Sequence, residues 1–234
     1  MKKIIGLLLM LVTMTATAQK DVTKFLGIPV DGYKAEMKKK LIDKGFEYNA
    51  KDDAFTGEFN GRNVNLFIAT NNNKVWRIIV CDANTSNESD IKIRFNTLCD
   101  QFAKNKKYVS ANLGMKDFKL SEDEDISYEM MVNSKRYEAA YYQILDPEKT
   151  DSVALKKRIN DALLLEYTQE QIDNPTEKQA KGIQRIIEDE TIHFSYDHMT
   201  KKFVWFMIKQ SSYKGYYISL FYDNEYNHSD GEDL

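Results

Sequence analysis

The chain contains 234 residues, of which 42% are hydrophobic and 12% aromatic, and it has only 3 prolines. This composition is typical of an ordered globular protein and excludes a disordered or collagen-like chain. The formal net charge is −3 at pH 7. Because a weakly acidic surface gives no electrostatic attraction to nucleic acid or anionic lipid, we expect neither of them among the partners.

The N-terminal residues predict a cleavable signal peptide over residues 1–18. Two lysines precede an apolar run at residues 4–14, and Ala16 and Ala18 then occupy the −3 and −1 positions of a cleavage site. A membrane anchor is the alternative, but the run has only 11 residues, whereas a spanning helix needs about 20. The residue directly after Ala18 is Gln19 and not a cysteine, so we expect an exported protein without a lipid anchor or integral membrane segment, which is periplasmic or secreted.

Hydrophobic periodicity predicts an α+β fold, with helices packed on one face of an antiparallel sheet. A first helix is expected around Met37 and Leu41. Residues 55–59 and 64–68 read as strands, and the Asn-Gly pair between them is typical of a two-residue hairpin turn. A third strand at residues 75–81 and a second helix follow, and the apolar stripe of that helix is Ile91, Phe95, Leu98 and Phe102.

The same order of elements recurs in the second half of the chain. Residues 131–135 align with residues 58–62 without a gap, and the alternating strand that follows each segment aligns as well. Trp76 and Trp205, which are the only tryptophans, then occupy matching places. We therefore predict two helix-plus-three-strand repeats, with an extra strand at 216–222 in the second repeat.

The repeats define the expected domain organisation. The first repeat with the helix that follows it covers residues 19–108, and the second, β-rich repeat covers residues 109–234. The second repeat contains many more residues before its tryptophan than the first, which indicates an insertion at about 146–200. The insertion is predicted to be helical, since its apolar residues are spaced as on a helix face: Leu155, Ile159, Leu163, Ile183 and Ile187.

The two cysteines leave two interpretations open. Cys81 ends the third predicted strand, and Cys99 borders the apolar stripe of the second predicted helix. In an oxidising compartment a disulfide could join the strand end to the helix. Two separately buried thiols are the more common arrangement, and we favour it.

The histidines and acidic residues give weak indications of metal binding. His193 and His198 lie near Glu190 and Asp197, which are side chains that bind zinc. A spacing of five residues places the two rings on opposite faces of a strand, or about 140° apart on a helix. Acidic residues also alternate at 123–127 and 223–227, but both segments lack the glycine and glutamate of a calcium loop. We expect no metal and no cofactor.

Motifs of catalysis are also missing from the sequence. It contains no G-x-S-x-G, no H-E-x-x-H, no phosphate-binding loop and no C-x-x-C. We predict no catalytic residues, and the balance of these observations disfavours an enzyme.

Two resemblances to known proteins bear on this interpretation. The chain resembles a group of exported proteins from Gram-negative gut anaerobes, a resemblance that implies no particular activity. The residues that carry it are FLGIPVDG at 25–32, Met37, Leu41, KGF at 44–46, FYDN at 221–224 and GEDL at 231–234. The order of elements also resembles the beta-lactamase inhibitor protein fold and the related fold of outer-membrane assembly lipoproteins. That resemblance implies a protein that binds other proteins without catalysis.

A short acceptor pattern is the one indication of covalent modification. Asp151, Ser152 and Val153 resemble the O-glycosylation site used by exported proteins of these anaerobes, so Ser152 is a candidate for the modified residue. The competing interpretation is that the segment is simply a helix N-cap.

Aromatic residues predict the binding surface. We select Trp76, Trp205, Tyr216 and Tyr222 as ligand-binding candidates, because tryptophan and tyrosine favour interfaces. Core packing is the alternative fate of such residues. The leading hypothesis is an exported, non-catalytic module that binds a protein, peptide or glycan in the cell envelope. The alternative is an envelope hydrolase of unrecognised type, which requires the histidines near residue 195 and an acid to converge.

Overall fold

The computed structural model describes residues 20–112, 117–211 and 215–228. The predicted signal peptide therefore lies outside the described residues. The chain divides into two compact units, one of residues 22–144 and 199–234 and the other of residues 145–198 together with residues up to 21. We call them the sheet unit and the insertion unit. Residues 145–198 overlap the segment in which the insertion is predicted, and both predicted repeats contribute to the sheet unit.

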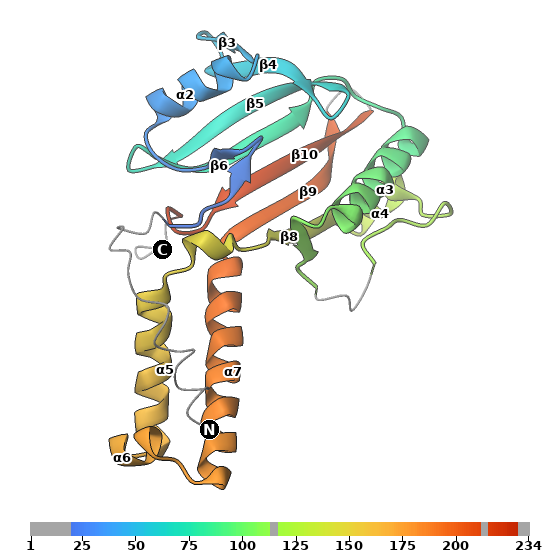
Figure 1. Cartoon of the computed structure of the whole chain (residues 1–234). Helices are drawn as coiled ribbons and strands as arrows, with labels where there is room; N and C mark the ends of the chain where they lie inside the picture. The colour runs from blue at the N-terminus through green and yellow to red at the C-terminus, as the bar shows by residue number, and fades with distance from the viewer. Residues whose placement is uncertain (1–19, 113–116, 212–214, 229–234) are drawn as a thin grey trace. The chain divides into compact units, whose positions relative to one another are not determined.

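An antiparallel sheet of eight strands forms the sheet unit in the described residues (Figure 1). The order across the sheet is β3-β4-β5-β6-β10-β9-β8-β7, and a separate pair is formed by β1 and β2. The strands are β1 Lys24–Phe25, β2 Ile28–Pro29, β3 Glu47–Asn49, β4 Ala54–Phe59, β5 Arg62–Asn71, β6 Lys74–Asp82, β7 Tyr108–Ser110, β8 Glu138–Gln143, β9 Lys202–Ser211 and β10 Gly215–Asn224. Each half of the chain contributes four consecutive strands, and the two halves meet where β6 pairs with β10.

Two tight turns fix the register of the first half. Asn60 and Gly61 connect β4 to β5 with φ angles of 52° and 70°, and Asn72 and Asn73 connect β5 to β6 with φ angles of 46° and 61°. Positive φ at both central residues is the geometry of a type I′ hairpin, which matches the twist of the strands. The hairpin predicted from Asn60 and Gly61 is thereby confirmed.

Three helices of the sheet unit contribute to one hydrophobic core. They are α2 Lys34–Asp43, α3 Glu88–Lys104 and α4 Ile126–Val132. Their buried side chains include Met37, Leu41 and Ile126, and the predicted stripe of α3 is buried as well. These residues form one cluster with alternate residues of the strands, such as Leu66 and Ile218. Because successive side chains of a strand point to opposite faces, the helices cover one face of the sheet.

The α+β class and the antiparallel sheet are confirmed, but the repeat differs in detail from the prediction. The first half is α2 followed by four strands rather than three, and in the second half α4 lies between β7 and β8. Residues 131–135 do not form a second hairpin, because Met131 and Val132 complete α4, a helix capped by the Asp125 carboxylate. Trp76 lies on the last strand of the first half and Trp205 on the third strand of the second half, so they are not equivalent positions.

The insertion unit is helical, as predicted. It contains the 3₁₀ turn η1 Pro147–Lys149 and the helices α5 Ser152–Glu166, α6 Gln169–Asp173 and α7 Glu177–Met199. Figure 1 shows α5 and α7 side by side, and the Arg158 guanidinium of α5 bonds to Glu190 and Asp197 of α7, both at 2.6 Å. In the part of the chain that the structure describes, none of the helices is both long and apolar enough to cross a membrane.

Candidate functional site

The candidate site is the face of the sheet opposite α2, α3 and α4, which we call the outer face. Its central feature is a row of apolar side chains that runs across five neighbouring strands. Strand register places them directly beside one another, in the order Phe67, Ile79, Phe221, Trp205 and Ala140. Since adjacent strands lie about 4.8 Å apart, this apolar row spans about 19 Å.

More polar rows flank the apolar row on both sides. The row on one side consists of Ala69, Arg77, Asp223, Phe203 and Tyr142, and the row on the other side consists of Asn65, Cys81, Ser219, Met207 and Glu138. The outer face therefore presents an apolar stripe with polar borders, a pattern that resembles the organisation of protein interfaces.

A β-bulge brings Trp76 onto the outer face. Ala69 pairs with Arg77 and Thr70 pairs with Val75, so Trp76 is an extra residue in β6. Both Val75 and Ile78 are fully buried in the core, which leaves the two residues between them on the opposite side. The bulge thus places Trp76 and Arg77 next to each other.

The buried carboxylate of Asp223 binds two other side chains of the outer face. The Asp223 side chain is only 1% exposed and accepts hydrogen bonds from Nε and Nη2 of Arg77, both at 2.6 Å. It also accepts a hydrogen bond of 2.9 Å from Nε1 of Trp205. Three donors on two strands therefore converge on one carboxylate, and a bidentate pair of this kind fixes the guanidinium in place.

The aromatic rings stack on one another around Arg77. The Trp205 and Phe221 rings are 4.1 Å apart at their centroids with an interplanar angle of 15°. The Arg77 guanidinium lies 4.2 Å from the Trp76 ring centroid and 5.0 Å from that of Phe221, and His228 packs against Trp76 at 4.5 Å. These groups therefore pack into one aromatic cluster around Arg77.

The structure assigns the four predicted binding residues to two different places. Trp76 and Trp205 lie together on the outer face, whereas Tyr216 and Tyr222 belong to the core, with exposed fractions of 7% and 5%. The Tyr216 hydroxyl lies 2.5 Å from the Ser127 hydroxyl of α4. Burial raises the pKa of Tyr222 well above its ordinary value. Tyr216 and Tyr222 are therefore removed from the candidate site, because even-numbered residues of β10 face the helices.

Sequence reasoning missed the partners that shape this surface. Arg77, Asp223 and Ile79 were not among the predicted site residues. Alternation along β6 and β10 places their side chains on the face of the sheet that points away from the core. The signal that could have found them is the pairing of β6 with β10, which joins residues 138 or more positions apart. Nothing in either segment alone indicates that pairing.

Both cysteines are free thiols. Cys81 lies on the outer face, where its sulfur is 3.4 Å from the Ser219 hydroxyl, whereas Cys99 is buried in the core on α3. Burial raises the pKa of Cys99 to about 12. The sheet separates the two sulfurs, so the candidate disulfide is not formed.

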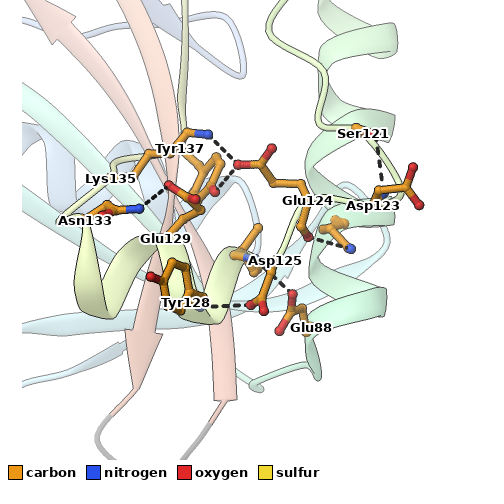
Figure 2. Close-up of polar contacts among 12 residues, drawn as sticks. Glu88, Ser121, Asp123, Glu124, Asp125, Tyr128, Glu129, Asn133, Lys135 and Tyr137 are labelled. Carbon is orange, nitrogen blue, oxygen red and sulfur yellow. Dashed lines mark hydrogen bonds and ion pairs between the residues drawn. The ribbon is translucent and has the colours of Figure 1, made fainter.

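The acidic connector before α4 uses its carboxylates for structural contacts (Figure 2). The Asp125 carboxylate accepts a hydrogen bond of 2.9 Å from the Tyr128 amide, and the Glu124 carboxylate binds the Lys135 ammonium and the Tyr137 hydroxyl. Glu88 of α3 accepts from the Ile126 amide at 2.9 Å. In the described residues no group of three or more His, Cys, Asp or Glu side chains is arranged to hold a metal ion.

His193 and His198 both lie on α7, where their spacing separates the two rings. The His198 ring packs against Phe194 at 4.0 Å, and its Nδ1 lies 2.8 Å from the Phe194 carbonyl oxygen. The nearby acids Glu190 and Asp197 both bind Arg158. The two carboxylates therefore join α7 to α5 through Arg158.

Ser152 is the first residue of α5, and Asp151 is the N-cap whose carboxylate accepts from the amides of Val153 and Ala154 at 3.1 Å and 2.9 Å. The N-cap interpretation of this segment is confirmed. O-glycosylation of Ser152 stays a prediction, and a glycan increment in the intact mass of the protein would test it.

Comparisons with known proteins add no constraint on the site. No family model matches the chain, and neither does any curated protein or solved structure. The interpretation of the outer face therefore depends on its own geometry.

Proposed function

We propose that the protein is an exported, non-catalytic binding module that uses its outer face to engage a protein, peptide or glycan of the cell envelope. The observation that carries this proposal is the apolar row, Phe67 to Ala140, on a face that α2, α3 and α4 leave uncovered. Phe67 in this row is 36% exposed, and an apolar stripe that solvent reaches is a surface that a binding partner can cover.

The aromatic cluster around Arg77 supports the same proposal. Tryptophan and arginine are the residue types that contribute most to binding energy at interfaces. Because Asp223 already fixes Arg77 and Trp205, little side-chain entropy would be lost when a partner binds. Export is part of the proposal and is supported by the charged, apolar and small-residue pattern of residues 1–18.

The hydrolase hypothesis has less support. It required His193, His198 and an acid to converge in one cleft, but the two histidines lie on different sides of α7 and the nearby carboxylates are paired with Arg158. A binding role is thus the function that the geometry favours.

A matched pair of exposed residues allows the proposal to be tested. Phe67 on the outer face and Ile42 on α2 are both exposed, at 36% and 50%, so a charge at either position should leave the fold intact. We expect the wild-type protein and Ile42→Glu to capture the same partner from envelope extract. We expect Phe67→Glu to lose most of that capture, because a carboxylate in the apolar row would have to be desolvated.

Near-UV circular dichroism would show that both variants are folded. Equal recovery of the partner by Phe67→Glu and Ile42→Glu would overturn the assignment of the outer face as the binding surface.

A further inference from the structure

The turn after β10 brings His228 against Trp76 of the outer face. The two rings lie 4.5 Å apart at their centroids, with an interplanar angle of 43°. The His228 side chain is 45% exposed, and its Nδ1 lies 3.4 Å from Oε2 of Glu225 in the same turn. Histidine is the side chain that ordinarily changes charge between about pH 5 and 8. The contact therefore joins an indole of the candidate site to a group whose charge depends on pH.

Hydrogen bonds of Asn227 fix the position of this turn. Its side-chain amide donates to the Asp31 carboxylate at 2.7 Å and to the Val75 carbonyl oxygen at 2.9 Å. Val75 and Asn227 each directly precede one of the two ring residues. These bonds therefore hold the rings within reach of each other, and rotation of the histidine side chain alone can open the contact.

The charges around the turn favour a cation at His228. Burial and the negative charge of Asp223 raise the pKa of Glu225 above its ordinary value of 4.5. The cations that act on Glu225 are His228, Arg77 and Lys201, and His228 has the largest effect of the three. Arg77 is already bound by Asp223. A protonated His228 is thus the cation that neutralises Glu225 most directly.

Protonation changes the energy of the contact in one direction. As an imidazolium, His228 gains the attraction of the Glu225 carboxylate and a cation–π interaction with the Trp76 ring. As a neutral imidazole it loses both and keeps only the packing of the two rings. Because the gain belongs to the charged form alone, the contact is most populated at mildly acidic pH, where Glu225 is still ionised. It opens as pH rises past neutrality.

We propose that His228 is a pH-sensitive cover of Trp76, which is closed while the imidazole is protonated and open when it is neutral. In the open state the Trp76 ring is accessible to the partner of the outer face, so binding there strengthens as pH rises. That consequence rests on the proposed function. The cover itself does not rest on it and can be measured on the free protein.

NMR spectroscopy of the whole chain between pH 5.5 and 8.5 tests the cover. We expect the nuclear Overhauser effect between the ring protons of His228 and Trp76 to fall several-fold from the low to the high end of this range. The indole N–H signal of Trp76 should shift with the same midpoint as the His228 ring. A nuclear Overhauser effect that stays constant while His228 changes charge would overturn the proposal.

Three substitutions identify the groups responsible. His228→Gln should abolish the pH-dependent shift of the Trp76 signal, whereas His193→Gln, at an exposed position of α7, should leave it unchanged. Glu225→Gln should move the midpoint to lower pH, because a neutral amide does not attract the imidazolium. A Trp76 shift that survives in His228→Gln, or a midpoint that Glu225→Gln leaves in place, would contradict the cover.

Partner capture at pH 6 and pH 8 separates this proposal from the proposed function. Capture that is stronger at pH 8 supports both. Absence of capture at either pH, with a nuclear Overhauser effect that still depends on pH, would count against the proposed function and support the cover.

Discussion

Among single residues, Asp223 has the largest role in shaping the outer face. Its carboxylate is buried and receives both nitrogens of Arg77 and the indole nitrogen of Trp205. Breaking a buried pair leaves an uncompensated charge, which costs more free energy than the pair itself contributes.

We predict that Asp223→Asn lowers the free energy of unfolding by about 2–4 kcal/mol, measured by urea titration with tryptophan fluorescence. Asp161→Asn is the control, because Asp161 pairs with Lys157 on the exposed surface of α5 and should give no measurable change. Equal effects of the two substitutions would contradict the role given to Asp223.

The thiols provide a second prediction at this scale. The thiolate is the reactive form of cysteine, and burial raises the pKa of both Cys81 and Cys99, the latter to about 12. Iodoacetamide at pH 8 should therefore modify the native protein slowly, and Cys99 more slowly than the half-buried Cys81. After unfolding without reductant, mass spectrometry should find both cysteines alkylated, whereas a protein with a disulfide would show neither.

At the scale of elements, the insertion unit depends on a close approach between α7 and the end of α5. A Cβ atom at Gly182 would clash with Oη of Tyr167 but would lie 3.4 Å from its Cζ, an ordinary contact distance. The clash thus involves the hydroxyl alone. Alanine is otherwise the better helix residue by about 1 kcal/mol.

The effect of Gly182→Ala on stability should therefore have opposite signs in the wild-type protein and in the Tyr167→Phe variant. We expect Gly182→Ala to destabilise the wild-type protein and to stabilise the Tyr167→Phe variant, which lacks the hydroxyl. Thermal unfolding of the four proteins in a double-mutant cycle measures this coupling. Additive effects of the two substitutions would mean that Gly182 and Tyr167 do not meet.

Acid should weaken the contacts that Glu124 makes in the connector before α4. Hydrogen bonds from Lys135 and Tyr137 lower the pKa of Glu124 below its ordinary value of 4.5. A lowered folded-state pKa contributes stability above pH 4.5 that is lost as pH falls through the folded-state pKa. The difference in unfolding free energy between wild type and Glu124→Gln should therefore shrink as pH falls below 4.5. A difference that stays constant down to pH 2 would contradict this contact.

The elements also show how far the sequence could predict this fold. The helical stripe from Ile91 to Phe102, the Asn60–Gly61 turn and the helical insertion depend on neighbouring residues, and all three are found in the structure. The pairing of β6 with β10 depends on residues far apart in sequence, and the sequence pattern does not encode it locally. For the same reason, the aromatic residues of β10 could not be divided between the core and the outer face.

At the scale of the whole molecule, the two units should fold independently. The insertion leaves the sheet between β8 and β9, which are direct neighbours with Tyr142 opposite Phe203. A short Gly-Ser linker in place of residues 146–198 can therefore join the strand ends. We expect this variant to keep one cooperative urea transition and the near-UV signal of Trp76 and Trp205. A non-cooperative transition would mean that the sheet unit needs the insertion.

The central claim is that the outer face binds a partner, and site-specific photo-cross-linking in the cell that produces the protein tests it most directly. A photoreactive phenylalanine analogue replaces either Phe67, within the apolar row, or Ile42, on α2 at the opposite face. We predict a discrete cross-linked product from position 67 and none from position 42. Cross-linking from position 42 alone, or the same products from both positions, would contradict the claim.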